Sequence, residues 1–210
     1  MSANTHQSVF TIGHSNLEFQ KFVALLKRHG IQAIADVRSS PYSQYNPQFN
    51  REPLQHALQE HNISYVFLGD ELGARRAERE CYVNDRADYA LIARTPAFIS
   101  CINRVIQGAA KLSIALMCSE KNPLDCHRCI LVSPHLRERG IQVFHILADG
   151  TIESHEQTES RLLHLFELPE PELFRSPDEI VAETYKLQGD KIAYQDDALA
   201  LREEPSRYGN

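Results

Sequence analysis

The stretch from Cys118 to Cys129 holds most of the residue types in this sequence that could do chemistry. It follows an apolar run and enters a segment expected to be helical. The free N–H groups and the dipole of a helix start favour an anion or a thiolate. Cys118 is therefore a candidate nucleophile, with Glu120 or His127 as its general acid or base. The planar guanidinium of Arg128 suits bidentate binding of a carboxylate or phosphate.

The same stretch allows two other interpretations, and both stay open at this point. Cys126 and Cys129 have C-x-x-C spacing, which suits a redox dithiol. Cys118, Cys126 and His127 would also serve as ligands for Zn²⁺ or an iron–sulfur cluster, although the sequence has no second C-x-x-C pair. Cys129 is equally a packing residue, because free cysteine is among the most buried residue types. The sequence requires no cofactor.

Polar residues also follow two further runs that are expected to be strands. His14 and Ser15 come after the first run, and Asp36 and Arg38 end the second. Ligands of open parallel sheets bind beyond the carboxyl ends of the strands, so these residues are expected to meet Cys118 at one rim. His14 would then move protons, or would only satisfy the backbone of a turn. Asp36 would be a general base or a ligand group, because burying a lone carboxylate is costly; the alternative is an ion pair with Arg38.

The segment Ser39–Phe49 is rich in proline, serine, asparagine and tyrosine and is expected to be a loop with no room for a helix. Tyr42 and Tyr45 are expected either to stack on a base or to cover the sheet edge. The residues expected to contact a ligand are Ser15, Arg38, Ser39, Tyr42, His127 and Arg128.

Two other groups of residues could take part in binding. Arg75, Arg76 and Arg79 lie in a charged stretch and are expected to form a solvated face. His145 and His155 flank the exit of the last expected strand. Of the two histidines, His155 is expected to be the better placed to reach a pocket.

Apolar, β-branched runs alternate with segments of helical periodicity along the first two thirds of the chain. This alternation predicts a doubly wound, mostly parallel sheet of about five strands between two layers of helices, a three-layer α/β arrangement that is Rossmann-like in the general sense. Residues 70–94 are charged and are expected to be a helical or irregular excursion over the sheet edge. Neither GxGxxG nor GxxxxGK[ST] is present. The strands are expected at residues 8–13, 31–37, 63–68, 112–117 and 141–147, and the helices near 19–29, 50–61, 96–107 and 125–139.

The pattern changes after Gly150, so we expect an α/β domain over residues 1–150 and a helical extension over 151–210. Residues 154–166 have a helical pattern that Pro169 and Pro171 would end. Ser176 followed by Pro177 predicts the start of another helix. The last twenty or so residues are expected to pack as a helix or to fray.

Composition excludes some classes of protein. The chain has 210 residues, a net charge of −6 and a pI near 5.9, which argues against an extended nucleic-acid surface but not against a small basic pocket. No apolar stretch approaches the roughly 18 residues that span a bilayer, and residues 1–9 lack the apolar core of a signal peptide. Five cysteines are an odd, irregularly spaced set, typical of free thiols in a reducing compartment, so a cytoplasmic location is expected.

Four ordered motifs carry a resemblance to a known family. They are Thr11-Ile12-Gly13-His14-Ser15, Asp36-Val37-Arg38-Ser39-Ser40-Pro41, Tyr65 through Leu68-Gly69 to Leu72-Gly73, and Leu116-Met117-Cys118-Ser119-Glu120 to Cys126-His127-Arg128. Over about residues 8–147 the chain resembles the bacterial and archaeal family called "domain of unknown function 488". The resemblance implies an α/β three-layer domain of prokaryotic type. It also implies that the family motif positions are His14, Asp36, Arg38, Cys118, Glu120, Cys126, His127 and Arg128.

The resemblance supplies a site but no reaction. Cys129 falls outside the family motif, which weakens the dithiol interpretation. The sequence also has Gly73-Ala74 where family proteins often show two glycines.

Three hypotheses about function follow. The leading one is an enzyme that acts on a small anionic ligand, such as a nucleotide or a nucleic-acid end. In it Arg38 and Arg128 hold the anion, Cys118 is the nucleophile or acid, and Glu120, Asp36 or His14 moves protons. The second is a metal or iron–sulfur site at Cys118, Cys126 and His127. The third is a binding or regulatory module that uses the Ser39–Phe49 loop; a homodimer is compatible with any of them.

Overall fold

A six-stranded sheet in the order β3-β2-β6-β1-β7-β8 forms the centre of the computed structural model, which describes residues 7–166 and 176–196. The first five strands in that order are parallel, and β8 runs antiparallel to β7 at one edge. The strand bounds are β1 Ser8–Gly13, β2 Ala33–Asp36, β3 Ser64–Phe67, β6 Ile114–Cys118, β7 Gln142–Ile146 and β8 Ile152–Ser154.

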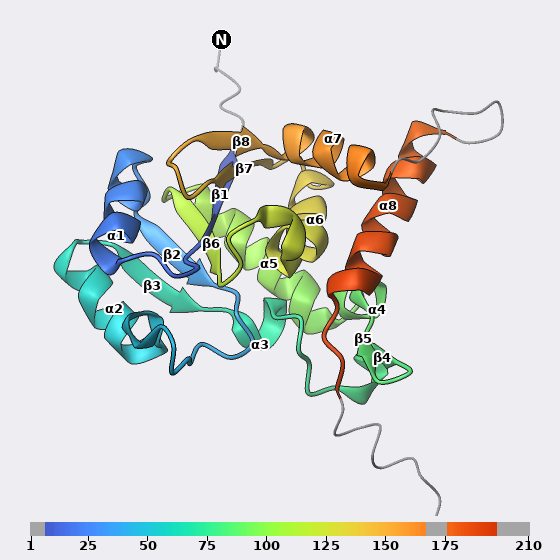
Figure 1. The fold of residues 1–210 in the computed structure, drawn as a ribbon, viewed down its shortest axis with the longest axis horizontal. Coiled ribbons are helices and arrows are strands. Elements are labelled where there is room, and N and C mark those ends of the chain that lie inside the picture. The colour runs from blue at the N-terminus through green and yellow to red at the C-terminus, as the bar shows by residue number, and fades with distance from the viewer. Residues whose placement is uncertain (1–6, 167–175, 197–210) are drawn as a thin grey trace, which may run out of the picture.

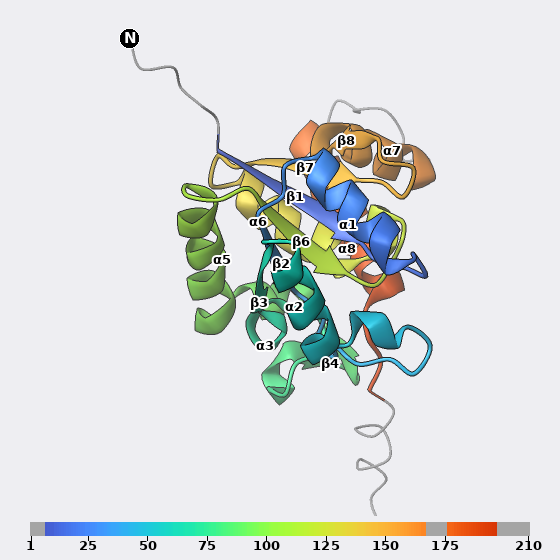
Figure 2. The ribbon, with the colours of Figure 1, turned by 90° about the vertical axis from the view of Figure 1, so that its left-hand side faces the viewer.

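Helices cover both faces of this sheet (Figures 1 and 2). Helices α1 (Phe19–Arg28) and α2 (Arg51–Glu60) pack on one face, and α5 (Pro96–Ala109) and α6 (Ser133–Arg137) pack on the other. Strand β6 shows why both layers are needed. Its side chains alternate, with Ala115 and Met117 in the core under α1 and α2, and Leu116 and Cys118 in the core under α5 and α6. The doubly wound α/β prediction is confirmed.

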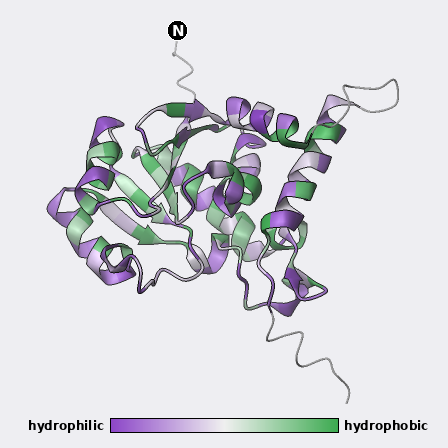
Figure 3. Cartoon of the chain, viewed as in Figure 1, coloured by the Kyte–Doolittle hydropathy of each residue, from purple (hydrophilic) through white to green (hydrophobic). Residues whose placement is uncertain are grey.

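Hydropathy follows these layers (Figure 3). All five residues of β6 are buried, as expected for an apolar strand covered on both faces. The helices carry their polar residues outward and end at predicted positions. Gly30 and Gly140, which follow α1 and α6, adopt positive φ angles of 64° and 78°, a conformation that glycine adopts without steric cost.

The excursion after β3 is more structured than predicted. It contains α3 (Gly69–Leu72), a 3₁₀ turn η2 (Arg79–Cys81), the hairpin β4 (Tyr82–Val83) and β5 (Arg86–Ala87), and α4 (Tyr89–Ala93). Asn84 and Asp85 form the hairpin turn with φ angles of 48° and 59°, and both are residue types that tolerate this region. The segment after α8 joins this hairpin, because the N–H of Ala87 donates to the carbonyl of Tyr194 over 2.9 Å.

The helix predicted near residues 125–139 is present as a continuous helical run over residues 127–137, but it is not a regular α-helix throughout. The chain forms a 3₁₀ turn η3 (Pro123–Asp125), a π-helical turn η4 (Arg128–Val132) and then α6. Pro134 lacks the N–H that a regular helix would direct at the carbonyl of Ile130, and the Ser133 hydroxyl donates to the carbonyl of Arg128 over 2.7 Å. Such π turns are frequent at functional sites. The loop prediction for 39–49 is also corrected at one end, where Pro47–Phe49 forms a 3₁₀ turn η1.

The C-terminal part begins with a strand that was not predicted. Strand β8 is followed by α7 (His155–Phe166) and α8 (Pro177–Ile192), which pack against each other (Figure 1). The predicted helix start at Ser176 is a capping box with Glu179. The predictions about Pro169, Pro171 and the last residues of the chain fall outside the described residues. Among the described helices, none has both the length and the apolar character to cross a membrane.

Candidate functional site

A cleft of about 640 Å³ lies beyond the carboxyl ends of β2 and β6. It is lined by residues from five separate parts of the chain: Arg38, Ser39, Ser40, Tyr42, Ala74, Arg75, Cys118, Ser119, Glu120, Asp125, Cys126, His127, Ile192, Ala193, Tyr194 and Gln195. A smaller hollow of about 320 Å³ shares Arg38, Ser40, Tyr42 and Ser119 with this cleft and adds His14 and Ser15. The predicted convergence of the strand ends is therefore present.

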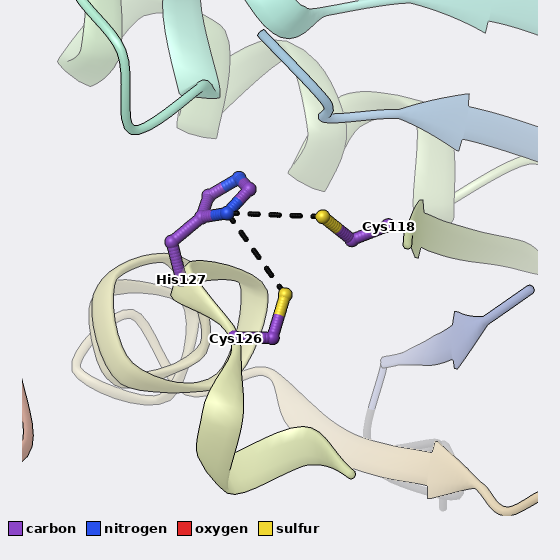
Figure 4. Close-up of side chains that lie close together, drawn as sticks. All are labelled: Cys118, Cys126 and His127. Carbon is purple, nitrogen blue, oxygen red and sulfur yellow. Dashed lines mark hydrogen bonds between the residues drawn. The ribbon is translucent and has the colours of Figure 1, made fainter. Parts of the chain in front are cut away.

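His127 and two thiols form the deepest group in the cleft (Figure 4). The imidazole Nε2 lies 2.9 Å from the carbonyl oxygen of Val37. A carbonyl only accepts, so Nε2 carries a proton and the neutral ring keeps its lone pair on Nδ1. That Nδ1 lies 3.8 Å from the sulfur of Cys118 and 3.9 Å from the sulfur of Cys126. The carbonyl of Val37 thus directs the basic nitrogen of His127 at both sulfurs.

The surroundings of Cys118 and Cys126 shift the pKa values of the two thiols in opposite directions. Burial would raise the pKa of Cys126, but a hydrogen bond from Cys118 and the charges of Arg128 and His127 hold it well below its usual range. The backbone N–H of Arg128 also donates to the Cys126 sulfur over 3.4 Å. Burial, together with the neighbouring charge on Cys126, raises the pKa of Cys118 well above its usual range. The Cys126 sulfur is therefore the better stabilised of the two as a thiolate, since it also accepts from the N–H of Arg128.

Arg128 supplies buried positive charge behind the two sulfurs. Its side chain is wholly buried, its Nη1 donates to the carbonyl of Glu120 over 2.9 Å, and its Nε has no hydrogen-bond partner. It does not line the cleft, so its position does not support the predicted direct contact with a ligand. A buried guanidinium needs compensating negative charge, and the Cys126 thiolate provides it. The thiolate pairing in turn raises the pKa of Arg128 against the opposing effect of burial.

Glu120 lies at the edge of this group. Its side chain is 42% exposed, and its Oε2 atom lies 4.0 Å from Nη1 of Arg128, beyond hydrogen-bonding distance. Burial and the charge on Cys126 raise the pKa of this carboxyl. Since Oε2 is buried without a hydrogen-bond partner, the geometry suits a carboxyl that carries a proton.

Asp36 and Arg38 form the ion pair that was the alternative to a catalytic role for Asp36. The carboxylate is wholly buried and accepts from Nε of Arg38 over 2.9 Å and from its Nη2 over 2.6 Å. Tyr65 donates to the same carboxylate over 2.7 Å. With its oxygens occupied, Asp36 has no capacity left for a general base. It orients Arg38, which lines the cleft.

His14 is also held as a positioning residue. Its ring stacks on Phe49 with centroids 4.3 Å apart. Its Nδ1 lies 2.8 Å from the carbonyl oxygen of Ser15, and its Nε2 lies 3.1 Å from Nη1 of Arg38. A guanidinium only donates, so His14 is neutral with its proton on Nδ1. The prediction that His14 moves protons is not supported, because both nitrogens are engaged.

This arrangement predicts a pH dependence of stability. Burial, and then the charge of Arg38, lowers the pKa of His14 from 6.5 to about 4. Between these values the unfolded chain binds a proton that the folded chain does not. The contribution of neutral His14 is therefore complete above pH 6.5 and is lost as the pH falls toward 4, by up to about 3 kcal/mol.

Urea unfolding of the wild type and of His14→Gln between about pH 7 and about pH 4.5 measures this contribution. The substituted glutamine does not titrate, so the difference in unfolding free energy between the two proteins should shrink on acidification. A difference that stays constant with pH would show that His14 does not contribute.

The loop after β2 supplies the outer wall of the cleft. Ser39 lines the cleft, and its hydroxyl accepts from the N–H of Arg75 over 2.9 Å. Tyr42 is 54% exposed and donates to Glu52 over 2.7 Å. Tyr45 is 83% exposed and does not line the cleft. Ser15 lines the smaller hollow rather than the main cleft.

Arg75 and Tyr194 are among the cleft residues that sequence reasoning missed. Arg75 is exposed, as expected for a solvated face, but it also lines the cleft with its guanidinium 4.5 Å from the ring centre of Tyr194. No local pattern marks either residue, because the contact joins the excursion after β3 to the segment after α8. For Arg76 the prediction of a solvated face is wrong. It is 7% exposed and pairs with Glu78 over 2.7 Å.

The C-x-x-C pair divides between two sides of its turn. Cys126 lines the cleft, whereas Cys129 belongs to a different cluster that includes His145 and His155. This arrangement does not support a dithiol. His155 is wholly buried, with its Nδ1 2.9 Å from Nε2 of His145, so the expectation that it reaches a pocket is wrong.

Comparisons with known proteins give one match. A family model described as "Domain of unknown function DUF488" matches residues 18–133, which include the loop after β2, the excursion and the Cys118–Arg128 segment. Neither the search of curated proteins nor the search of solved structures returned a match.

Proposed function

Because the chain belongs to the family described as domain of unknown function DUF488, whose description names no reaction, we propose a function from the geometry of the cleft. The protein is a thiol-dependent enzyme that acts on a small anionic substrate, with Cys126 as its nucleophile. One observation carries this proposal. The Nδ1 atom of His127 faces the sulfur of Cys126 at 3.9 Å while its Nε2 is held by a carbonyl.

A base in that position activates a thiol by taking its proton. The product is a thiolate–imidazolium pair, and the buried Arg128 favours the thiolate electrostatically. The roles of the two cysteines therefore differ from those expected from the sequence. Cys126 attacks, and Cys118 supports it as a hydrogen-bond donor.

Protons for the leaving group are available beside the sulfur. The thiolate attacks an electrophilic centre, a bond forms to Sγ, and the bond to the leaving group breaks. The leaving group takes a proton from the carboxyl of Glu120, whose pKa is raised by burial and by the Cys126 charge. Water then attacks the covalent intermediate and the bond to Sγ breaks. Glu120, now a carboxylate, takes the proton of that water, and the Cys126 thiolate is restored beside protonated His127.

The substrate class follows from the cations and rings that line the cleft. Arg75 lines the cleft with its guanidinium group, and Arg38 adds positive charge that Asp36 partly compensates; guanidinium groups suit carboxylate or phosphate. Tyr42 and Tyr194 add aromatic surface from separate parts of the chain. A volume of about 640 Å³ lies in the usual range for small-molecule sites. A small anion with a planar group, such as a nucleotide, matches this lining.

Alkylation tests the nucleophile without knowledge of the substrate. Iodoacetate is an anion that transfers a carboxymethyl group to a thiolate with release of iodide. Near pH 6 it should modify Cys126 at least about 10-fold faster than the buried Cys101, because a thiol of ordinary pKa is almost fully protonated there. Mass spectrometry of digested protein identifies the modified residue. Alkylation of Cys126 should persist in Cys118→Ser and should be slower in His127→Gln.

A matched pair of variants tests the anion preference. Arg75→Met should lower the rate ratio of iodoacetate to neutral iodoacetamide at Cys126. Arg79→Met, in the same charged stretch but not lining the cleft, should leave that ratio unchanged. Modification of Cys118 in preference to Cys126, or an inert Cys126, would refute the proposed nucleophile.

A second candidate function is a metal centre at the same residues. Cys118, Cys126 and His127 offer ligand atoms that all lie within 4.8 Å of one another, and two sulfurs with one nitrogen suit Zn²⁺. If the protein retains bound metal and loses it when either Cys118 or Cys126 is replaced, a metal centre is favoured over a catalytic nucleophile at this site. A non-catalytic module that uses the Ser39–Phe49 loop is less well supported, because Tyr42 lines a concave cleft together with the two thiols.

A further inference from the structure

A second group of potential ligands lies outside the cleft, on the other side of the turn that carries Cys126. It consists of Cys129 in η4, His145 in β7 and His155 at the start of α7. All three side chains are at most 1% exposed. Their ligand atoms lie within 4.8 Å of one another, and none of them lines the cleft.

The outer nitrogen of each histidine is held by an oxygen. Nδ1 of His145 lies 2.7 Å from the hydroxyl of Thr11, which stands opposite it on the neighbouring strand. Nε2 of His155 lies 2.8 Å from the hydroxyl of Tyr185 in α8. Tyr185 donates its own proton to Glu159 over 3.1 Å, so it accepts the Nε2 proton of His155.

This pattern leaves the inner nitrogens facing one point. With its proton on Nε2, His155 directs the lone pair of Nδ1 inward, where Nε2 of His145 lies 2.9 Å away. The sulfur of Cys129 lies 4.0 Å from the same His145 nitrogen. Metal-bound histidines typically have their second nitrogen fixed in this way.

We propose that Cys129, His145 and His155 bind a divalent transition metal, most favourably Zn²⁺, as a site separate from the cleft. One thiolate and two imidazoles are a donor set that Zn²⁺ prefers, with the fourth position taken by water. Two ligands at tetrahedral angles on Zn²⁺ lie about 3.3 Å apart. The two inner nitrogens lie 2.9 Å apart, so they need to separate by about 0.4 Å to bind one ion.

A metal at this site would stabilise the turn that carries Cys126, on the side away from the cleft. Cys129 is three residues after Cys126 in the same turn, and His145 belongs to a central strand. A metal there would join η4, β7 and α7, with Tyr185 adding α8 through its bond to His155. It would therefore fix the position of Cys126 and His127 without contact with a substrate.

Cobalt binding to the full chain, freed of metal by chelation, tests the proposal. Co²⁺ replaces Zn²⁺ and shows thiolate-to-metal charge transfer in the near ultraviolet. The wild type should bind one equivalent with this absorption. Cys129→Ala and His155→Gln should lose it, whereas Cys126→Ser should retain it. Tyr185→Phe should bind about 10- to 100-fold more weakly, because it removes only the partner of His155.

Two outcomes would overturn the proposal. One is a wild-type protein that binds no Co²⁺ and gains no thermal stability from Zn²⁺. The other is metal that is lost in Cys126→Ser but kept in Cys129→Ala, which would place the ion in the cleft. If Cys129→Ala fails to fold, Tyr185→Phe still tests the proposal, because it keeps all three ligands. A Co²⁺ affinity of Tyr185→Phe equal to that of the wild type would contradict the proposed geometry. The alkylation test of Cys126 is independent of these results.

Discussion

Replacement of Asp36 by alanine is expected to lower the free energy of unfolding by about 3–5 kcal/mol, because it leaves a buried guanidinium without its counter-charge. Asp36 is wholly buried and Arg38 is 5% exposed. Three donors of Arg38 bind the carboxylate, namely the backbone N–H, Nε and Nη2, over 3.1, 2.9 and 2.6 Å.

Two control variants separate the charge from the packing. Tyr65→Phe removes one hydrogen bond to the same carboxylate and should cost only about 1 kcal/mol. The double variant Asp36→Ala with Arg38→Met removes both charges and should recover part of the loss, as buried pairs replaced by apolar residues often do. Urea unfolding measures all four proteins. A loss in Asp36→Ala no larger than that in Tyr65→Phe would show that the pair contributes little.

Asp36→Ala should also alter the cleft. Arg38 lines it, and its orientation depends on Asp36 and on His14, whose Nε2 accepts from Nη1 over 3.1 Å. Without the carboxylate the guanidinium is still held by His14 and by the carbonyl of Phe49, but its charge is no longer compensated. The preference of Cys126 for iodoacetate over iodoacetamide should then rise at temperatures where the variant is folded.

The second large effect is expected at Gly13, the last residue of β1. A Cβ at this position would overlap the carbonyl oxygen of Glu120 and would lie 3.1 Å from Nη2 of Arg128. The obstacle is backbone rather than the end of a flexible side chain, so the segment that follows β6 must move. Gly13→Ala should therefore destabilise the fold by about 3 kcal/mol, at the upper end for overpacking.

Gly108→Ala is a matched control for Gly13→Ala. A Cβ at Gly108 would meet only the terminal methyl of Ile114, and alanine favours a helix interior by about 1 kcal/mol. Its unfolding free energy should stay within about 1 kcal/mol of the wild type. Gly13→Ala should in addition slow alkylation of Cys126, because the Arg128 contact to Glu120 is displaced. Equal stability of the two variants would show that the close approach at Gly13 is relieved easily.

Both predictions concern the same rim, where residues distant in sequence meet. Arg38 reaches the cleft because Asp36 holds it, and Arg128 stays beneath the sulfurs because Gly13 leaves it room. In the proposed mechanism the two guanidinium groups therefore have different tasks. Arg38 lines the cleft that would receive the substrate, and Arg128 would support the Cys126 thiolate.

The sequence by itself determined the sheet and the location of the site. Apolar runs such as 112–117 have to be covered on both faces, so their order along the chain predicts a parallel sheet. The polar residues after β1, β2 and β6 meet because parallel strands end at a common edge. His14, Arg38 and Cys118 were placed near one another on this basis.

Only the tertiary structure decided which side chain does what. The difference between Cys118 and Cys126 depends on the buried Arg128, whose backbone N–H donates to the Cys126 sulfur, and this contact leaves no periodic pattern. Arg75 and Tyr194 line the cleft because the segment after α8 pairs with a distant hairpin. Strand propensity and periodicity are local properties of the chain, whereas the direction of a side chain and the charge beside it depend on residues brought together by packing.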